Sequence, residues 1–70
     1  MIRHPVESSN LRSVGYDEAT RTLEIEFHSG GIYQYYDVPS EVYQELLQAP
    51  SLGKYFHARI RNTYRYQRVG

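Results

Sequence analysis

The six residues Thr22–Phe27 read TLEIEF, an alternation of polar and apolar side chains that decides the fold class. Leu23, Ile25 and Phe27 point to one side of an extended chain, and the two glutamates between them point to the other side. A period of two residues is typical of a strand that packs one face on a core and exposes the other to water. The stretch therefore predicts a half-buried β-strand in an antiparallel sheet.

Turns on both sides of this strand connect it to two further predicted strands. Ser29–Gly31 contains two glycines, which readily adopt the positive φ angles of a tight hairpin, and the aromatic-rich stretch Ile32–Tyr36 follows it. On the other side, Leu11–Tyr16 is predicted to be a strand and Asp17–Thr20 a polar turn. These segments together predict a three-stranded antiparallel meander.

Helical periodicity replaces the strand pattern after Val38–Pro39. Proline cannot donate a hydrogen bond to a sheet but suits the first turn of a helix, so the sheet is expected to end there. Val42 and Leu46 recur at the spacing of an amphipathic helix that continues to about Gln48 and stops before Pro50. A first helix is therefore predicted directly after the meander.

A second helix is predicted to begin after Ser51, whose hydroxyl makes a good N-cap. An apolar stripe at positions i, i+4 and i+8 marks its buried side, and basic residues at i, i+3 and i+7 mark another side. The apolar stripe is Leu52, Phe56 and Ile60, and the basic stripe is Lys54, His57 and Arg61. The predicted fold class is thus α+β: a three-stranded meander with two short helices on one face and a short basic C-terminal strand or tail.

Seventy residues provide for one domain, which we place at residues 9–70 behind a flexible N-terminal arm of residues 1–8. The chain has no cysteine, which excludes disulfides, thiolate zinc ligands and a cysteine nucleophile. Small secreted domains usually need disulfides, so a cytoplasmic location is predicted. No apolar run approaches the roughly 20 residues of a membrane span.

A net charge of zero conceals a separation of charge along the chain. Residues 1–53 contain three arginines and all eight acidic residues, for a net charge of −5, whereas residues 54–70 carry a net charge of +5 with no acid. This asymmetry is a recognised indication of polyanion binding; alternatively, the basic end balances the acidic body within one fold. The basic residues are Lys54, Arg59, Arg61, Arg65 and Arg68.

Tyrosines are interleaved with these arginines near the C-terminus. A groove for single-stranded nucleic acid uses guanidinium groups for phosphate and ring faces for bases. The alternative is a solvated edge strand whose arginines pair with Glu24, Glu26 or Glu41. The predicted nucleic-acid-binding residues are Lys54, His57, Arg59, Arg61, Tyr64, Arg65, Tyr66 and Arg68.

Eight tyrosines accompany only two phenylalanines and no tryptophan, so the core must use tyrosine rings. Tyr33 and Tyr35 lie two residues apart on one predicted strand and project from the same face. We interpret them as a core wall under the helices, with a base-stacking platform as the alternative, and Tyr36 is the better candidate for exposure. The predicted core motif is Tyr33, Tyr35, Val38, Pro39, Phe56 and Ile60.

Across residues 9–69 the chain resembles the KTSC domain, a family named after the C-terminal extension of some lysyl-tRNA synthetases. One departure is His57, because the family often has asparagine after its Tyr-Phe pair. The resemblance implies a small α+β module that also occurs as stand-alone bacterial and phage proteins. RNA binding is implied because some members are attached to a tRNA synthetase. The resemblance supplies no catalytic residues. The matching motifs are Ser9, Leu11, Val14–Asp17, Leu23–Phe27, Gly31–Tyr35, Val38–Pro39, Ser51–Phe56, Ile60–Arg61 and Tyr64.

Catalytic and metal sites are not predicted. The three histidines are widely spaced along the sequence, whereas zinc needs three or four converging ligands. Ser51–Lys54 resembles the end of a phosphate-binding loop, but the preceding strand and the full motif are missing, so nucleotide hydrolysis is not indicated and Ser51 is interpreted as a plain N-cap. Glu24 and Glu26 share a strand face, yet a two-carboxylate hydrolase needs a walled cleft.

These observations predict a non-catalytic, cofactor-free module, favoured as a monomer, that binds RNA or another polyanion through its basic C-terminal third. A protein-interaction or self-associating module is the alternative, because an acidic body and a basic end can dock head to tail. If all five basic side chains neutralise single-strand phosphates, affinity should fall about a hundredfold between ~50 and ~200 mM salt.

Overall fold

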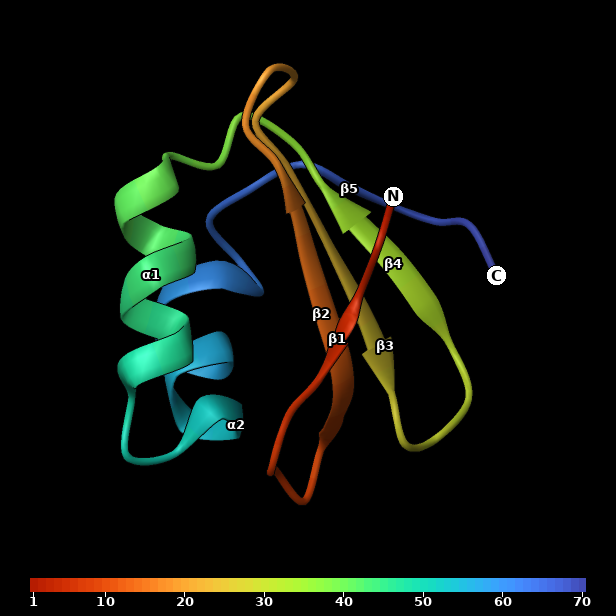
Figure 1. Ribbon diagram of the computed structural model, residues 1–70, viewed down its shortest axis with the longest axis vertical. Coiled ribbons are helices and arrows are strands. Elements are labelled where there is room, and N and C mark those ends of the chain that lie inside the picture. The colour runs from red at the N-terminus through yellow and green to blue at the C-terminus, as the bar shows by residue number, and fades with distance from the viewer.

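Five antiparallel strands form one twisted sheet in the computed structural model, which describes all 70 residues (Figure 1). Each strand pairs with the next in sequence, so the sheet is a meander with the order β1-β2-β3-β4-β5. The strands are β1 (His4–Pro5), β2 (Leu11–Asp17), β3 (Thr22–Phe27), β4 (Ile32–Tyr35) and β5 (Tyr66–Arg68).

The α+β class and the three predicted strands are confirmed, but the sheet has five strands, because both ends of the chain add an edge strand. β1 arises within the predicted arm, where His4 lies opposite Val14 and Pro5 lies opposite Ser13 of β2. β5 pairs with β4 at the other edge and is the C-terminal strand that the sequence left open as a strand or a tail. Two- and three-residue strands carry too little alternation to be recognised in a sequence.

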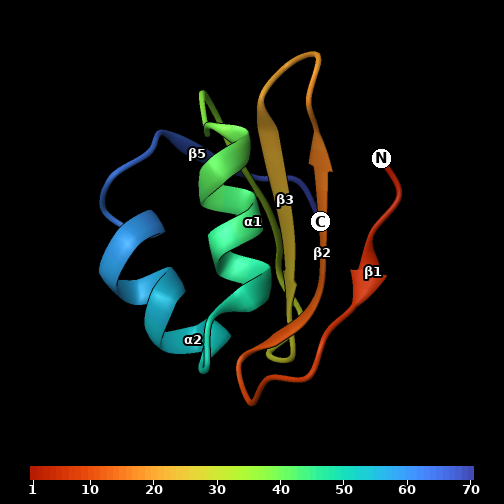
Figure 2. The same ribbon diagram turned by 60° about the vertical axis from the view of Figure 1, so that its left-hand side comes forward.

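Both helices cover the same face of the sheet, and β1 lies at the edge on the side away from them (Figure 2). α1 (Ser40–Gln48) follows Pro39, as predicted. α2 (Leu52–Tyr55) begins after Ser51, whose hydroxyl accepts a hydrogen bond from the Lys54 amide at 3.3 Å. α2 continues directly into a π-helical turn, η1 (Phe56–Ile60).

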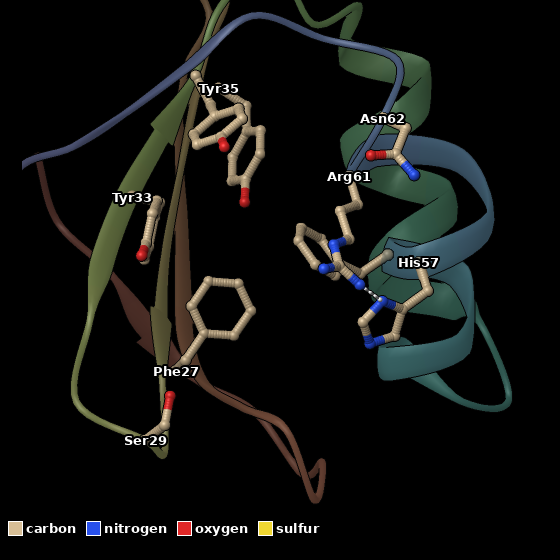
Figure 3. A pocket seen from close by; sticks show the side chains of 9 residues that line it. Phe27, Ser29, Tyr33, Tyr35, His57, Arg61 and Asn62 are labelled. Carbon is tan, nitrogen blue, oxygen red and sulfur yellow. Dashed lines mark hydrogen bonds between the residues drawn. The ribbon is translucent and has the colours of Figure 1, made fainter.

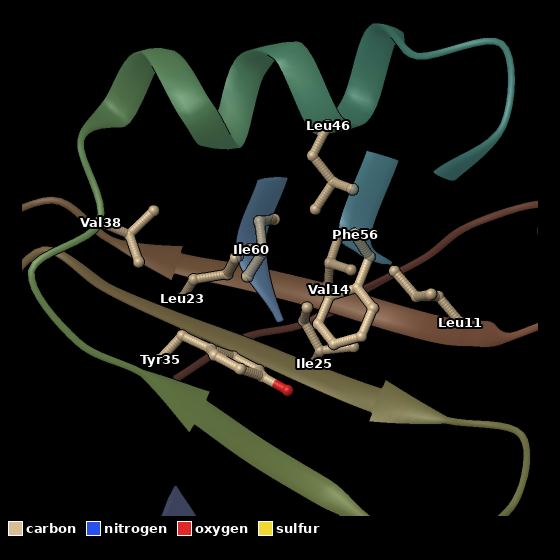
Figure 4. Close-up of a cluster of buried hydrophobic side chains, with 9 residues drawn as sticks. All are labelled: Leu11, Val14, Leu23, Ile25, Tyr35, Val38, Leu46, Phe56 and Ile60. Carbon is tan, nitrogen blue, oxygen red and sulfur yellow. The ribbon is translucent and has the colours of Figure 1, made fainter. Parts of the chain in front are cut away.

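The core lies between α1, η1 and the concave side of β2, β3 and β4 (Figure 4). Leu46 reaches it from α1, and Phe56 and Ile60 reach it from η1. The alternation predicted for β3 holds on the helix side, where Leu23 and Ile25 are both fully buried. Exposure of the opposite side to water was wrong, because Glu24 there is buried and bonded to Arg3 and Gln34. The nine core residues are Leu11, Val14, Leu23, Ile25, Tyr35, Val38, Leu46, Phe56 and Ile60.

A polar network covers the opposite face of the sheet. Arg3 donates to Glu24 at 2.5 Å and to the Ser13 hydroxyl at 3.0 Å, and Gln34 donates to the other carboxylate oxygen of Glu24 at 2.8 Å. Burial alone would raise the pKa of Glu24, but the hydrogen bonds from Gln34 and Arg3 and the charge of Arg3 outweigh it, so this pKa is lowered. The network fastens the N-terminal segment to the sheet.

The lowered pKa of Glu24 predicts a loss of stability in acid. Because the folded-state pKa lies below the unfolded value, the ionised carboxylate stabilises the fold above pH 4.5, and this contribution disappears as the pH falls through the folded-state pKa. Urea unfolding across this range should therefore depend less on pH in Glu24→Gln than in the wild type. Glu18→Gln, at an exposed turn position, is the control; equal pH dependence in all three proteins would contradict this account.

Candidate functional site

An open cleft of about 440 Å³ lies between strands β3, β4 and β5 on one side and η1 on the other (Figure 3). Aromatic side chains from β3 and β4 form one wall, and polar side chains from η1 and the following turn form the other. The nine lining residues are Phe27, Ser29, Tyr33, Tyr35, Phe56, His57, Arg61, Asn62 and Tyr66.

The aromatic wall is a connected cluster of rings. Tyr66 lies 5.6 Å from Tyr35 at an interplanar angle of 33° and 6.0 Å from Tyr33 at 52°. Phe56 meets Tyr35 edge to face at 5.6 Å and Phe27 at 5.2 Å. Phe56 and Tyr35 are buried, whereas Tyr66 is 57% exposed and presents its ring to solvent. The cleft therefore offers a fixed inner wall and one accessible ring at its rim.

Strand register explains why these rings share a face. Tyr35 is paired with Tyr66 and Tyr33 with Arg68 across β4 and β5, and directly opposed residues project from the same side of an antiparallel sheet. The Arg68 guanidinium lies over the Tyr33 ring at 6.0 Å from its centroid. The three-residue strand β5 thus brings one aromatic ring and one cation to the cleft side.

The π-helical turn sets the polar wall. The Arg61 amide bonds to the Phe56 carbonyl, five residues back, at 2.9 Å, so the backbone completes its turn one residue later than in an α-helix. Phe56 and Ile60 both lie in the core, and Arg61 and Asn62 line the cleft beside His57. Isolated π turns are frequent at functional sites.

The electrostatic character of the cleft favours an anion. None of its nine lining residues is acidic, and Arg61 is exposed at its mouth. The single hydrogen bond between side chains of these residues joins Arg61 to His57 Nδ1 at 3.4 Å. Burial, assisted by the neighbouring Tyr33 and Tyr66 hydroxyls, raises the pKa of Tyr35 to about 12 despite the opposing charge of Arg61. The Tyr35 hydroxyl therefore keeps its proton and can donate a hydrogen bond.

The structure gathers some of the predicted binding residues and separates others. His57, Arg61 and Tyr66 line the cleft, and Arg68 lies beside it on Tyr33. Tyr64 packs against the core from the loop before β5.

The remaining predicted cations lie elsewhere. Lys54 borders a separate hollow with Tyr55, and Arg59 is exposed on η1. Arg65 lies 5.4 Å from the centroid of the Tyr36 ring and pairs with Asp37 at 3.4 Å, so Asp37 takes the place of the glutamates that the sequence offered as partners. The five basic residues therefore do not share one surface.

Four lining residues were not identified from the sequence as ligand contacts, and one of them is Phe56, which was assigned to the core. Phe27 was assigned to the core through its alternation, and Ser29 was assigned to the hairpin. Asn62 carried no signal, because its place depends on the π turn. Gly53, within the segment that resembles the end of a phosphate-binding loop, faces Asn10: a Cβ atom there would lie 2.9 Å from the Asn10 side-chain nitrogen.

No group of three or more histidine, cysteine, aspartate or glutamate side chains is arranged to hold a metal ion. Neither helix has the length and apolar content that crossing a bilayer requires. The aromatic cleft, flanked by Arg61 and Arg68, is therefore the candidate site.

Comparison with known proteins adds three findings. The family model described as the KTSC domain matches residues 7–66. An uncharacterized protein of Stutzerimonas stutzeri is 49% identical over 70 residues, covering 99% of both chains. A crystal structure of a KTSC domain protein from Yersinia pestis superposes with a TM-score of 0.96 and 39% identity, covering 99% of this chain and 97% of that one.

A larger relative places a similar segment inside a longer enzyme. A lysine–tRNA ligase of a Nostoc species is 43% identical over 63 residues, which are 90% of this chain but only 11% of the ligase. The two full-length matches and this partial one agree that the domain occurs both alone and as part of a larger protein.

Proposed function

The chain belongs to the KTSC domain family, and from the chemistry of its cleft we propose that it binds single-stranded RNA. An unpaired base stacks on Tyr66 and enters the aromatic cleft, while Arg61 and Arg68 contact the flanking phosphates. The observation that carries this proposal is the combination in one open cleft of an exposed ring, a row of supporting rings and an arginine, without any acidic side chain.

Physical chemistry supports a base as the ligand. Every nucleobase has a π face, and stacking on an aromatic side chain contributes roughly 1–3 kcal/mol per base without demanding a particular sequence. The protonated Tyr35 hydroxyl and the Asn62 amide face the same cleft and offer hydrogen-bond groups to a base edge. Bases in a duplex are already paired and stacked on one another and cannot stack on Tyr66, so the proposal is restricted to unpaired nucleotides.

The choice of RNA has independent support. Proteins whose name states action on tRNA, the lysine–tRNA ligases, contain a segment 43% identical to this chain in the Nostoc example. An RNA-handling enzyme is a natural carrier for a module that holds unpaired nucleotides. The ligase activity itself lies outside the comparison, because the matching segment is only 11% of that protein.

Salt dependence tests this proposal and distinguishes it from binding by the whole basic segment. We expect a fluorescently labelled single strand of ~10 nucleotides to bind with a log–log salt slope of about −1.4, because two cations near the cleft each contribute about −0.7. Affinity should then fall roughly sevenfold between ~50 and ~200 mM salt, rather than the hundredfold expected for five cations.

The matching duplex is the control for the anisotropy measurement and should bind more weakly than the single strand at both salt concentrations. Equal binding of duplex and single strand would contradict the role of the cleft. No binding of either at low salt would overturn the proposal and leave the protein-interaction module as the alternative. Sedimentation at several protein concentrations would then test self-association.

A further inference from the structure

A second hollow of about 300 Å³ opens beside the aromatic cleft. It shares Phe27, Ser29 and His57 with the cleft, so the two hollows adjoin each other. The turn before β2 and the turn after β3 supply its remaining wall. Its six lining residues are Ser9, Asn10, Phe27, His28, Ser29 and His57.

Resting on the proposed function, we propose that this second hollow is a phosphate subsite, so the preferred ligand is a nucleoside phosphate with its base in the aromatic cleft. The two hollows differ in chemistry: five of the nine residues lining the cleft are hydrophobic, but only one of the six lining the second hollow is. A ligand that fills both spaces must therefore be aromatic at one end and polar at the other.

The hydrogen-bond partners of His57 determine what it can offer to a ligand. Arg61 can only donate, so the 3.4 Å contact requires His57 Nδ1 to accept. In that tautomer the ring proton lies on Nε2, which has no hydrogen-bond partner within the chain. His57 thus presents an N–H donor at the junction of the two hollows, held in orientation by the residue that also lines the cleft.

The other polar residues of the hollow suit the same anion. His28 is anchored by its Nε2 atom, which lies 2.9 Å from the Ser8 carbonyl oxygen and must donate to it. Ser9 and Ser29 contribute hydroxyls, and Asn10 contributes an amide. No acidic residue lines the hollow, so donors face an anion without a competing negative charge.

Titration with a nucleoside, its 5′-monophosphate, its 3′-monophosphate and inorganic phosphate alone, followed by amide NMR, tests the subsite. At least one monophosphate should bind about tenfold more tightly than the nucleoside, the gain that a charge-assisted hydrogen bond supplies. His57→Ala should abolish this advantage. His57→Gln should retain most of it, because the glutamine amide can place an N–H donor near the position of Nε2.

Lys54→Ala, in a separate hollow, is the matched control and should leave the phosphate advantage unchanged. Suppose that the single-stranded oligonucleotide binds but that neither monophosphate binds more tightly than the nucleoside. The phosphate subsite is then overturned and the proposed function stands, and the same holds if neither the monophosphates nor the nucleoside bind. A preserved advantage in His57→Ala also overturns it. If the oligonucleotide itself fails to bind, the proposed function fails first.

Discussion

Replacing Phe56 by alanine should remove most of the free energy of unfolding. Phe56 is 4% exposed and joins the second helix to the sheet through edge-to-face contacts with Phe27 and Tyr35. Truncation of a buried phenylalanine typically costs about 3–5 kcal/mol, whereas a chain of this length has a total stability of roughly 4–10 kcal/mol. We therefore expect a variant with only a few kcal/mol of stability left and a thermal midpoint well below that of the wild type.

Urea and thermal unfolding followed by circular dichroism measure this effect. Leu47→Ala provides the control, because Leu47 is also an apolar helical residue but is 43% exposed, and it should change the free energy of unfolding by less than about 1 kcal/mol. If Phe56→Ala cost no more than Leu47→Ala, the second helix could not be packed on the sheet through this ring.

Removing Tyr66 and Arg61 together should weaken binding of single-stranded RNA by roughly a hundredfold. The lost base stacking accounts for about 1–3 kcal/mol, and the lost charge-assisted contact to phosphate adds to it. Both side chains are exposed, so the double variant should keep its fold, which the same unfolding measurement verifies. Anisotropy with the labelled oligonucleotide measures the affinity.

The molecule provides a matched control for this double variant on the other face of its sheet. Arg65 lies over the Tyr36 ring at 5.4 Å, so Tyr36→Ala with Arg65→Ala removes the same two residue types and the same charge. This control should lower the affinity less than about threefold. Equal losses in the two double variants would indicate that binding depends on overall charge and tyrosine content and not on the cleft.

Local sequence signals were sufficient to predict the longer strands and helices. The alternation in Thr22–Phe27, the spacing of Val42 and Leu46, and the N-cap at Ser51 each describe interactions within a few residues, and each is present in the structure. The predicted apolar spacing of Phe56 and Ile60 also places both side chains in the core.

Features that depend on distant contacts could not be predicted in this way. β1 is held through Arg3 and Glu24, which are 21 positions apart, and nothing near Arg3 in the sequence indicates this partner. The apolar spacing of Phe56 and Ile60 fits an ordinary α-helix, so the sequence does not indicate the extra residue of the π turn. The position of Arg61 beside the cleft could therefore not be predicted.

The candidate site illustrates the same limit. A count of charges along the sequence treats the C-terminal basic residues as one group, but the fold places them on different sides of the sheet. Arg68 reaches the helix side of the sheet because it faces Tyr33 across β4 and β5, whereas Arg65 packs on Tyr36 on the other side. Tyr33 and Tyr35 combine the two alternatives considered for them, because Tyr35 is buried in the core and both rings also line the cleft.

The most direct test of the central claim is an amide NMR titration of the protein with the single-stranded oligonucleotide at ~50 mM salt. Binding in the cleft predicts that the largest shifts occur in β4, in the π turn and in β5, including Tyr33, Arg61 and Tyr66, while the outer-face residues Arg3 and Tyr36 change little. Shifts concentrated on the outer face, or spread evenly over all basic residues, would contradict the account.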